Sequence, residues 1–266
     1  ALARCNADGS LDTSFGIGGK MTTDFGDSGD FVGLVAIQSD GKIVAAGQSD
    51  YDFALARFNA DGSLDTTFGT SGKVTTDFGG DDAGESMAIQ SDGAIVMVGW
   101  SNAGGNADFA LARYNANGSL DTSFGTGGKV TTDFGGNSHG LSVAIQGDGR
   151  IVVSGNAVVG SPSDFALARY NANGSLDTTF GAGGKVTTDF GGAGGADSGN
   201  SVAIQSDGRI VVAGFSNAGG FNDFALARYN ANGILDTTFG TGGKVTTDFE
   251  GDDVGSSVAI QSTAGS

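Results

Sequence analysis

The side chains with the clearest capacity for chemistry are carboxylates that stand just before strand-like runs of the sequence. They are Glu85, Asp81, Asp82, Glu250, Asp252 and Asp253. Hydrolysis of a glycosidic bond needs a carboxylic acid and a carboxylate, as base or nucleophile, at a defined separation. If the fold places these groups around one funnel, the chain is a carboxylate glycosidase. Against this hypothesis, most of the candidates are Asp-Asp pairs, and none belongs to a distinctive catalytic signature.

A serine esterase is a second hydrolase hypothesis, because Ser138 precedes His139, the one histidine of the chain. A nucleophile and its base must approach to about 3 Å beside an orienting acid, which adjacency in sequence does not provide. No G-x-S-x-G elbow is present either, so the esterase is the less favoured hydrolase. One histidine and one cysteine exclude a conventional zinc site. The cysteine, Cys5, stands where other copies of a repeat have Phe or Tyr, so we expect a packed thiol.

Oxygen-rich turns suggest calcium as the only candidate cofactor. Asn6, Asp8 and Asp12 alternate as the ligands of a calcium loop do. Three of the equivalent segments have Asn in place of Asp8, and the bidentate Glu of a true calcium loop is missing. An Asx turn explains the same residues, since Asn and Asp bond to their own backbone. The turn is therefore favoured, and no metal site is predicted with it.

All of these residues lie in a tandem repeat. The motif ALAR recurs five times, with its arginines at Arg4, Arg57, Arg113, Arg169 and Arg228. Within residues 201–249 the runs SVAIQ, RIVVAGF, FALARYN and KVTTDF are separated by turns rich in Gly, Asn and Asp. Four short antiparallel strands per repeat are typical of a propeller blade. We predict an all-β fold, a five-bladed β-propeller of four-stranded antiparallel blades, forming one domain over residues 1–266 with repeats of 53–59 residues.

The closing blade is expected to be composite. The N-terminus supplies a third and a fourth strand, and the run SVAIQ at Ser257–Gln261 supplies a first strand. Joining them would spare the ring two open edges. No second strand is available for this blade. Either the blade has three strands, or a neighbouring molecule fills the place by self-association, or the chain is a slice of a longer array.

The ALAR arginine falls on the same side of its strand as Phe and Leu, so we expect it to point into an interface between blades. A buried guanidinium needs an acidic partner. Each repeat offers two candidates, the Asp of LDT, such as Asp177, and the Asp of TTDF, such as Asp189. Either would form a structural ion pair.

The text of the repeat resembles a known family. FALARYNANGSLDTTF at residues 165–180 and GTGGKVTTDFGG at residues 125–136 resemble the bacterial delta-60 repeat, and the strand order is similar to that of NHL-like β-propeller blades. The resemblance covers essentially the whole chain. It implies a secreted or surface protein of tandem blades, and it brings no catalytic motif with it.

The loops after the predicted second and fourth strands differ among the copies, whereas those after the first and third strands barely change. In a propeller the variable loops share one face, and loops held by a rigid scaffold commonly carry function. Aromatic rings beside carboxylates and amides suit a polar small molecule or a glycan. The competing interpretation is a solvated acidic rim. The residues expected to bind the ligand are Tyr51, Trp100, His139, Phe221, Asp81, Asp82 and Glu85.

Charge narrows the classes of partner. A formal net charge of −17 argues against nucleic acid, whose phosphates are neutralised by clustered Lys and Arg. No apolar run approaches the length of a membrane helix, so membrane insertion is not expected. The favoured function is an extracellular or bacterial cell-surface binding module. The alternatives are a hydrolase with its active site at the central funnel and a purely structural surface repeat unit.

Overall fold

The computed structural model describes residues 1–26, 29–159, 162–191 and 194–261, and every regular element in these ranges is a β-strand. Four antiparallel sheets have four strands each, which are neighbours in chain order. Blade 1 consists of β3 (Phe31–Ile37), β4 (Ile43–Ser49), β5 (Asp52–Phe58) and β6 (Lys73–Thr76). Blade 2 consists of β7 (Asp82–Ile89), β8 (Ile95–Ser101), β9 (Asp108–Tyr114) and β10 (Lys129–Thr132). Blade 3 consists of β11 (Ser138–Ile145), β12 (Ile151–Val158), β13 (Ser163–Tyr170) and β14 (Lys185–Thr188). Blade 4 consists of β15 (Asp197–Ile204), β16 (Ile210–Ser216), β17 (Asp223–Tyr229) and β18 (Lys244–Thr247).

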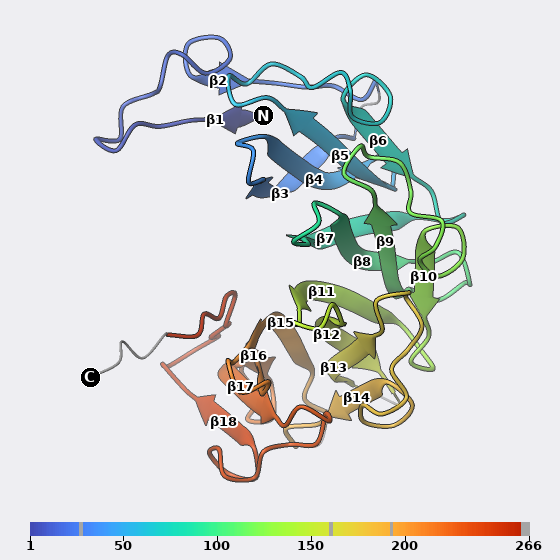
Figure 1. Cartoon of the computed structure of the whole chain (residues 1–266). Coiled ribbons are helices and arrows are strands. Elements are labelled where there is room, and N and C mark those ends of the chain that lie inside the picture. The colour runs from blue at the N-terminus through green and yellow to red at the C-terminus, as the bar shows by residue number, and fades with distance from the viewer. Residues whose placement is uncertain (27–28, 160–161, 192–193, 262–266) are drawn as a thin grey trace.

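The blades follow one another around an arc, with the first strands β3, β7, β11 and β15 in contact along its inner side (Figure 1). A two-stranded sheet of β1 (Leu2–Ala3) and β2 (Lys20–Met21) precedes blade 1. Leu2 and Met21 pack against buried side chains of blade 1. The β-propeller architecture predicted from the repeat is confirmed, with β1 and β2 as the third and fourth strands of the fifth blade.

The closing blade is less regular than the four others. The segment Ser257–Gln261 lies along blade 4, where the Val258 amide donates a hydrogen bond to Ser201 Oγ at 3.1 Å, but it forms no strand. Within the described ranges no strand pairing joins this segment to β1 or β2, and Figure 1 shows the two ends of the arc apart. In each complete blade the first strand pairs with the second strand, and no described residues supply a second strand here.

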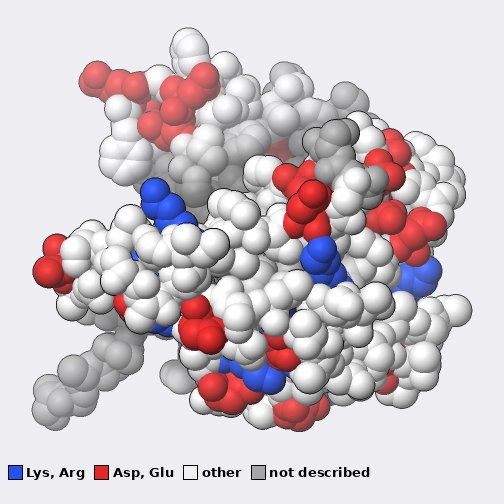
Figure 2. Space-filling view, turned by 90° about the horizontal axis from the view of Figure 1, so that it is seen from above, with Lys and Arg blue, Asp and Glu red and all other residues white. Residues whose placement is uncertain are grey.

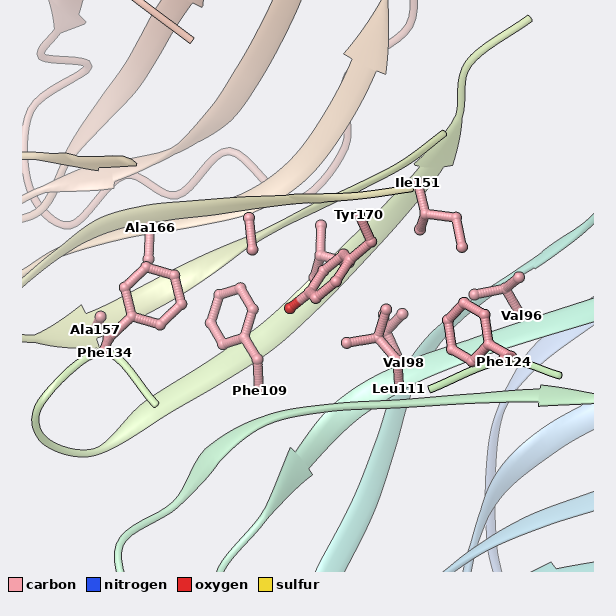
Figure 3. Close-up of a cluster of buried hydrophobic side chains, with 12 residues drawn as sticks. Val96, Val98, Phe109, Leu111, Phe124, Phe134, Ile151, Ala157, Ala166 and Tyr170 are labelled. Carbon is pink, nitrogen blue, oxygen red and sulfur yellow. The ribbon is translucent and has the colours of Figure 1, made fainter. Parts of the chain in front are cut away.

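Packing between adjacent blades forms the core. One buried cluster joins blade 2 to blade 3 (Figure 3). In it Val98, Leu111 and Phe124 of blade 2 face Ile151 and Tyr170 of blade 3, and all five are completely buried. The consecutive apolar residues of strands such as β8 are explained by this arrangement, because an inner strand is covered on both faces. Equivalent clusters join blade 1 to blade 2 and blade 3 to blade 4.

A buried hydrogen bond ties each of these interfaces together. The Tyr170 hydroxyl donates to Thr132 Oγ1 of the preceding blade at 2.8 Å, and the Tyr114–Thr76 and Tyr229–Thr188 pairs have the same length. Burial raises the pKa of each tyrosine hydroxyl. The phenols are therefore neutral donors throughout the physiological pH range.

The ALAR arginine connects adjacent blades, and we call this contact the interblade tie. Its acidic partner is the Asp of LDT. Arg169 Nε donates to Asp177 Oδ2 at 2.9 Å, and the guanidinium lies over the Phe180 ring, 4.6 Å from its centroid. Nη1 reaches the carbonyl of Ala231 in the next blade. The Asp of TTDF is not the partner: Asp189 Oδ1 instead accepts a hydrogen bond from the amide of Gly191 in its own turn.

The exterior is acidic, and Figure 2 shows several separate patches of acidic side chains on one side, with few basic side chains between them. No helix in the described part of the chain has the length and apolar character of a membrane span. Cys5 is exposed, contrary to the expected packed thiol. The tyrosine at this position in blades 2, 3 and 4 is covered by the preceding blade, and no described blade precedes β1.

Candidate functional site

The variable loops gather at one end of the blades. Strands alternate in direction within an antiparallel sheet, so the loops after second and fourth strands leave from the same end. The hydrogen bonds agree: the Asn102 amide, after β8, donates to the Asp81 carbonyl, before β7, at 3.0 Å. The Asn217 amide, after β16, donates to the Ala196 carbonyl, before β15, also at 3.0 Å. We call this end the variable face.

Variation among the repeats also occurs inside the strands, at the inner edge of the variable face. Register pairs the first-strand residues Phe31, Ala83, His139 and Ser198 with the second-strand residues Gln48, Trp100, Asn156 and Phe215. In all four sheets the register shifts just after this pair, and the first-strand residue two positions further on is unpaired. Bulges re-aim a side chain, and here they hold residues that differ from copy to copy. These residues are Gly33, Glu85, Leu141 and Asn200.

A glycine in the second strand makes the bulge possible. A Cβ built on Gly99 would lie 1.8 Å from the Ala83 carbonyl oxygen, which no real side chain tolerates. Gly47, Gly155 and Gly214 meet the same obstruction in the other blades, at 1.7–2.1 Å. The repeated glycine of IVVAG thus fixes the path of the first strand and, through it, the position of Glu85.

The bulge of blade 2 brings three of the predicted site residues together. The rings of Trp100 and His139 lie across the junction of blades 2 and 3 with centroids 5.3 Å apart and planes 37° apart. Glu85 retains an exposed surface. Burial of its carboxyl nonetheless raises its pKa, and hydrogen bonding with the Trp100 side chain opposes this rise. Burial lowers the pKa of His139, so the imidazole is neutral at pH 7.

Amide and hydroxyl side chains extend along the inner edge of the variable face from blade 3 to blade 4. Asn156 Nδ2 donates to Ser198 Oγ at 3.2 Å, Ser198 Oγ donates to Asn200 Oδ1 at 2.8 Å, and Asn200 Nδ2 donates to the Gly255 carbonyl at 3.2 Å. None of these three residues was predicted from the sequence. Comparison of the strand residues of the copies, rather than of the loops alone, would have identified them. We call the six residues Glu85, Trp100, His139, Asn156, Ser198 and Asn200 the inner rim cluster.

Other predicted ligand residues lie on loops outside this cluster. Tyr51 is 61% exposed in the turn between β4 and β5, and Phe221 is 65% exposed in the loop before β17. Asp81 Oδ2 accepts a hydrogen bond from Asn102 Nδ2 at 3.3 Å, and Asp252 Oδ1 accepts one from the Asn222 amide at 3.0 Å. Glu250 is exposed after β18. The structure therefore spreads the carboxylates of the glycosidase hypothesis over separate blades.

Ser138 and His139 are not brought together as a nucleophile and a base. Successive strand residues point to opposite faces of a sheet, and no hydrogen bond joins these two side chains. Ser138 is completely buried, and its hydroxyl has no hydrogen-bond partner.

The proposed calcium ligands near the N-terminus are engaged within their own turns. Asp8 Oδ1 accepts hydrogen bonds from the Ser10 amide at 2.9 Å and from the Ser10 hydroxyl at 2.6 Å. Asp12 accepts from Ser14 through one oxygen and from Arg4 Nε through the other. Asn6 Nδ2 donates to the Ser10 hydroxyl at 3.0 Å. These are the contacts that the Asx-turn alternative expects.

Clusters of three aspartates occupy the junctions between blades at the variable face. Each combines the Asp that opens or nearly opens a third strand, the Asp of TTDF, and the Asp that begins the next blade or, after blade 4, the equivalent Asp253. The pKa values of Asp52 and Asp164 are raised, mainly by burial and to a smaller extent by the neighbouring carboxylates. The clusters are Asp52 with Asp77 and Asp82, Asp164 with Asp189 and Asp197, and Asp223 with Asp248 and Asp253.

Several surface hollows lie elsewhere on the described part of the chain. They are open grooves that repeat along the outer edges of the blades, with volumes of about 380–680 Å³. A representative groove is lined by Thr126, Lys129 and Thr131 of one blade and by Asn173 and Ser175 of the next. Each groove includes the fourth-strand Lys of its repeat, whereas other lining residues, such as Ile17 and Val159, differ between grooves.

Comparison with known proteins agrees with this architecture. No curated protein matches the chain in sequence. An endo-arabinase from Bacteroides thetaiotaomicron VPI-5482 has a similar structure, at a TM-score of 0.50 and 12% identity, over 80% of this chain and 78% of the other. Drosophila Plexin A in complex with Semaphorin 1b matches at a TM-score of 0.43 and 13% identity, over 79% of this chain and 42% of the other. The family model described as a β-propeller domain of unknown function, DUF5122, matches residues 1–15, 38–68, 90–124, 146–180 and 205–239, so the chain belongs to this β-propeller family.

Proposed function

We propose that this protein is an extracellular or cell-surface binding module that takes a polar ligand, such as a carbohydrate, at the inner rim cluster. The observation that carries the proposal is that repeats of nearly identical sequence have different residues at equivalent strand positions along the inner edge of the variable face. At these positions blades 2 and 3 place Trp100 beside His139, with Glu85 in the adjoining bulge. The finer resemblance to the delta-60 repeat, which implies secreted or surface proteins, agrees with the location.

The chemistry of the rim suits a sugar. The half-buried indole of Trp100 offers an apolar face for stacking, and its neighbour His139 is a neutral donor and acceptor. Asn156 and Asn200 add amides that can exchange hydrogen bonds with hydroxyl groups. A mostly apolar platform with a few placed polar groups is the usual composition of a small-molecule site.

A glycan array followed by calorimetry with the retained glycan tests the proposal. Replacing Trp100 with alanine removes the stacking platform, and a central tryptophan of an interface contributes about 2 kcal/mol or more. Affinity is expected to fall roughly 30-fold. Ile37→Ala is the matched control, because Ile37 is 73% exposed at the opposite end of β3. Loss of binding in Phe221→Ala with full binding in Trp100→Ala would move the site to the outer loops.

Activity assays on the same purified protein distinguish the hydrolase alternative from the binding module. Glycan and chromogenic ester panels report turnover, and Glu85→Gln removes the one carboxylate of the rim while keeping its shape. Turnover that Glu85→Gln or His139→Ala abolishes would replace the binding module with an enzyme. Glycan binding without turnover excludes the enzyme. The endo-arabinase likeness concerns the fold alone and does not decide between them.

A further inference from the structure

We propose that two blade junctions at the variable face bind a hard divalent cation, with Ca²⁺ as the best fit. The junction of blades 1 and 2 supplies one site, and the junction of blades 3 and 4 supplies the other. The ligands are Asp52, Asp77 and Asp82 in the first site and Asp164, Asp189 and Asp197 in the second.

The carboxylates are close enough to share one ion. Within each cluster, one oxygen atom from each residue lies within 4.8 Å of the others. Two oxygens bound to the same Ca²⁺ at about 2.3–2.6 Å can be at most about 5 Å apart. Both clusters therefore meet the geometric requirement without movement of the backbone.

In each site one aspartate is fixed by a hydrogen bond to one of its carboxylate oxygens, while its other oxygen has no hydrogen-bond partner. Asp82 is 1% exposed and Asp197 is completely buried. One oxygen of each is used, since Asp82 Oδ2 accepts from the Phe78 amide at 2.6 Å and Asp197 Oδ2 accepts from the Phe190 amide at 2.8 Å. The other oxygen, Oδ1, is buried and accepts no hydrogen bond of normal geometry, although a serine hydroxyl lies beside each carboxylate and the Asn217 amide lies beside that of Asp197. A buried carboxylate oxygen without a partner is costly, and a cation would satisfy it.

The charge of each site is not balanced by the protein. Among the described residues no Lys or Arg forms an ion pair with these six carboxylates. Lys129 Nζ, whose charge acts on Asp82, donates to the Asp77 main-chain carbonyl at 2.8 Å and lies over the Phe78 ring. Lys244 does the same at the second site, at the Asp189 carbonyl. Three carboxylates against one ammonium leave about two negative charges, which one divalent ion cancels.

The donor atoms indicate which ion. The clusters contain only carboxylates, and zinc sites are built from Cys and His as a rule. Mg²⁺ requires a near-ideal octahedron and gives up its water reluctantly, whereas Ca²⁺ accepts irregular sets of oxygens. A site assembled from two blades and three separate strand ends therefore favours Ca²⁺.

The remaining junctions provide an internal comparison. Between blades 2 and 3 the first two aspartates are present as Asp108 and Asp133, but Ser138 replaces the third. Only two carboxylates remain there, one fewer than in each of the three clusters. The cluster Asp223, Asp248 and Asp253 lies at the open end of the arc, where none of its members is fully buried.

Titration with CaCl₂ after removal of metal with EDTA tests the proposal. Calorimetry on the wild-type chain should detect binding, and Asp82→Asn and Asp197→Asn should each remove one equivalent of bound Ca²⁺. Asn keeps the shape and can still accept the hydrogen bond from the Phe78 or Phe190 amide. Asp92→Asn, an exposed residue in the β7–β8 turn at the opposite end, is the charge-matched control and should bind as the wild type does. Ser138→Asp should add one equivalent at the junction of blades 2 and 3.

Thermal unfolding separates a metal site from a purely structural one. In EDTA, Asp82→Asn should be at least as stable as the wild type, because it removes a buried and repelled carboxylate. In Ca²⁺ the wild type should gain in Tm, and the Asp82→Asn/Asp197→Asn double variant should lose most of that gain. Wild-type protein that shows neither heat nor a Tm shift at millimolar Ca²⁺ overturns the proposal. So does a double variant that binds Ca²⁺ with the wild-type stoichiometry.

Discussion

Replacing Arg169 with alanine measures how much one interblade tie stabilises the propeller. The substitution removes the bond to Asp177 Oδ2, the contact with the Ala231 carbonyl of blade 4 and the stacking on Phe180. The side chains of Arg169 and Asp177 are each only 5% exposed, so Asp177 would remain as a buried carboxylate. Breaking a buried pair by removing one partner costs about 3–5 kcal/mol.

The lower end of that range applies here. Arg150 Nε lies 3.2 Å from Asp177 Oδ2 and would still offset part of the charge, although the Arg150 side chain is 40% exposed. A loss of about 3 kcal/mol lowers Tm by roughly 6–12 °C in a domain of this size. Arg169→Lys keeps the charge without the planar fork, so it should fall between the wild type and Arg169→Ala.

The first repeat provides the control. Arg4 and Asp12 form the same pair at 2.9 Å, but their side chains are 35% and 25% exposed. Exposed pairs contribute about 0–1 kcal/mol, so Arg4→Ala should shift Tm by no more than roughly 4 °C. Differential scanning calorimetry at neutral pH reads both shifts. Equal shifts in the two variants would refute the dependence on burial, and an unchanged Tm in Arg169→Ala would refute the tie itself.

Two further substitutions test the packing that positions the inner rim cluster. Gly99→Ala places a methyl group 1.8 Å from the Ala83 carbonyl, so we expect a loss of about 1–3 kcal/mol or more in chemical denaturation. Gly147→Ala meets nothing within 4 Å and should be neutral or slightly stabilising; equal losses would exclude a role for the bulge. Tyr170→Phe should cost about 1 kcal/mol or more, because it leaves the buried Thr132 hydroxyl without its partner. Adding Thr132→Val should then recover part of the loss, and full additivity of the two changes would contradict the hydrogen bond.

The repeat sequence was sufficient to predict the strands and the position of the ALAR arginine between blades. FALAR and KVTT form adjacent strands in every complete blade, and Arg169 points across to the next blade. The choice between the two acidic partners required the structure. Asp177 lies eight residues after Arg169 in a turn that folds back onto the strand, whereas Asp189 lies beyond the fourth strand, at the opposite end of the sheet.

The parts that could not be predicted depend on contacts between distant segments. Asp52 and Asp82 belong to different blades, and only the junction makes them neighbours of Asp77. The sequence places Asp82 in a variable loop and so predicts it at a ligand surface, but as the first residue of β7 it is buried and accepts a hydrogen bond from the Phe78 amide. The glycine of β8 was visible in every copy. This glycine is required by the bulge in the neighbouring first strand. The bulge depends on how the two strands pair, which the sequence of one strand alone does not reveal.

Two blade junctions, between blades 1 and 2 and between blades 3 and 4, carry opposite charge arrangements at their two ends. At the constant end a guanidinium from ALAR, such as that of Arg169, joins an acid of its own blade to a carbonyl of the next. At the variable end three carboxylates meet without an ion pair in two fully covered junctions, and their mutual repulsion opposes the contact that the Tyr–Thr bonds support. A divalent cation at the variable end would therefore complete the same tie with the charges reversed. It would also make the spacing of blades 3 and 4, which carry Asn156, Ser198 and Asn200 of the inner rim cluster, depend on the ion. The proposed ligand affinity should therefore fall in EDTA even though no rim residue is a metal ligand.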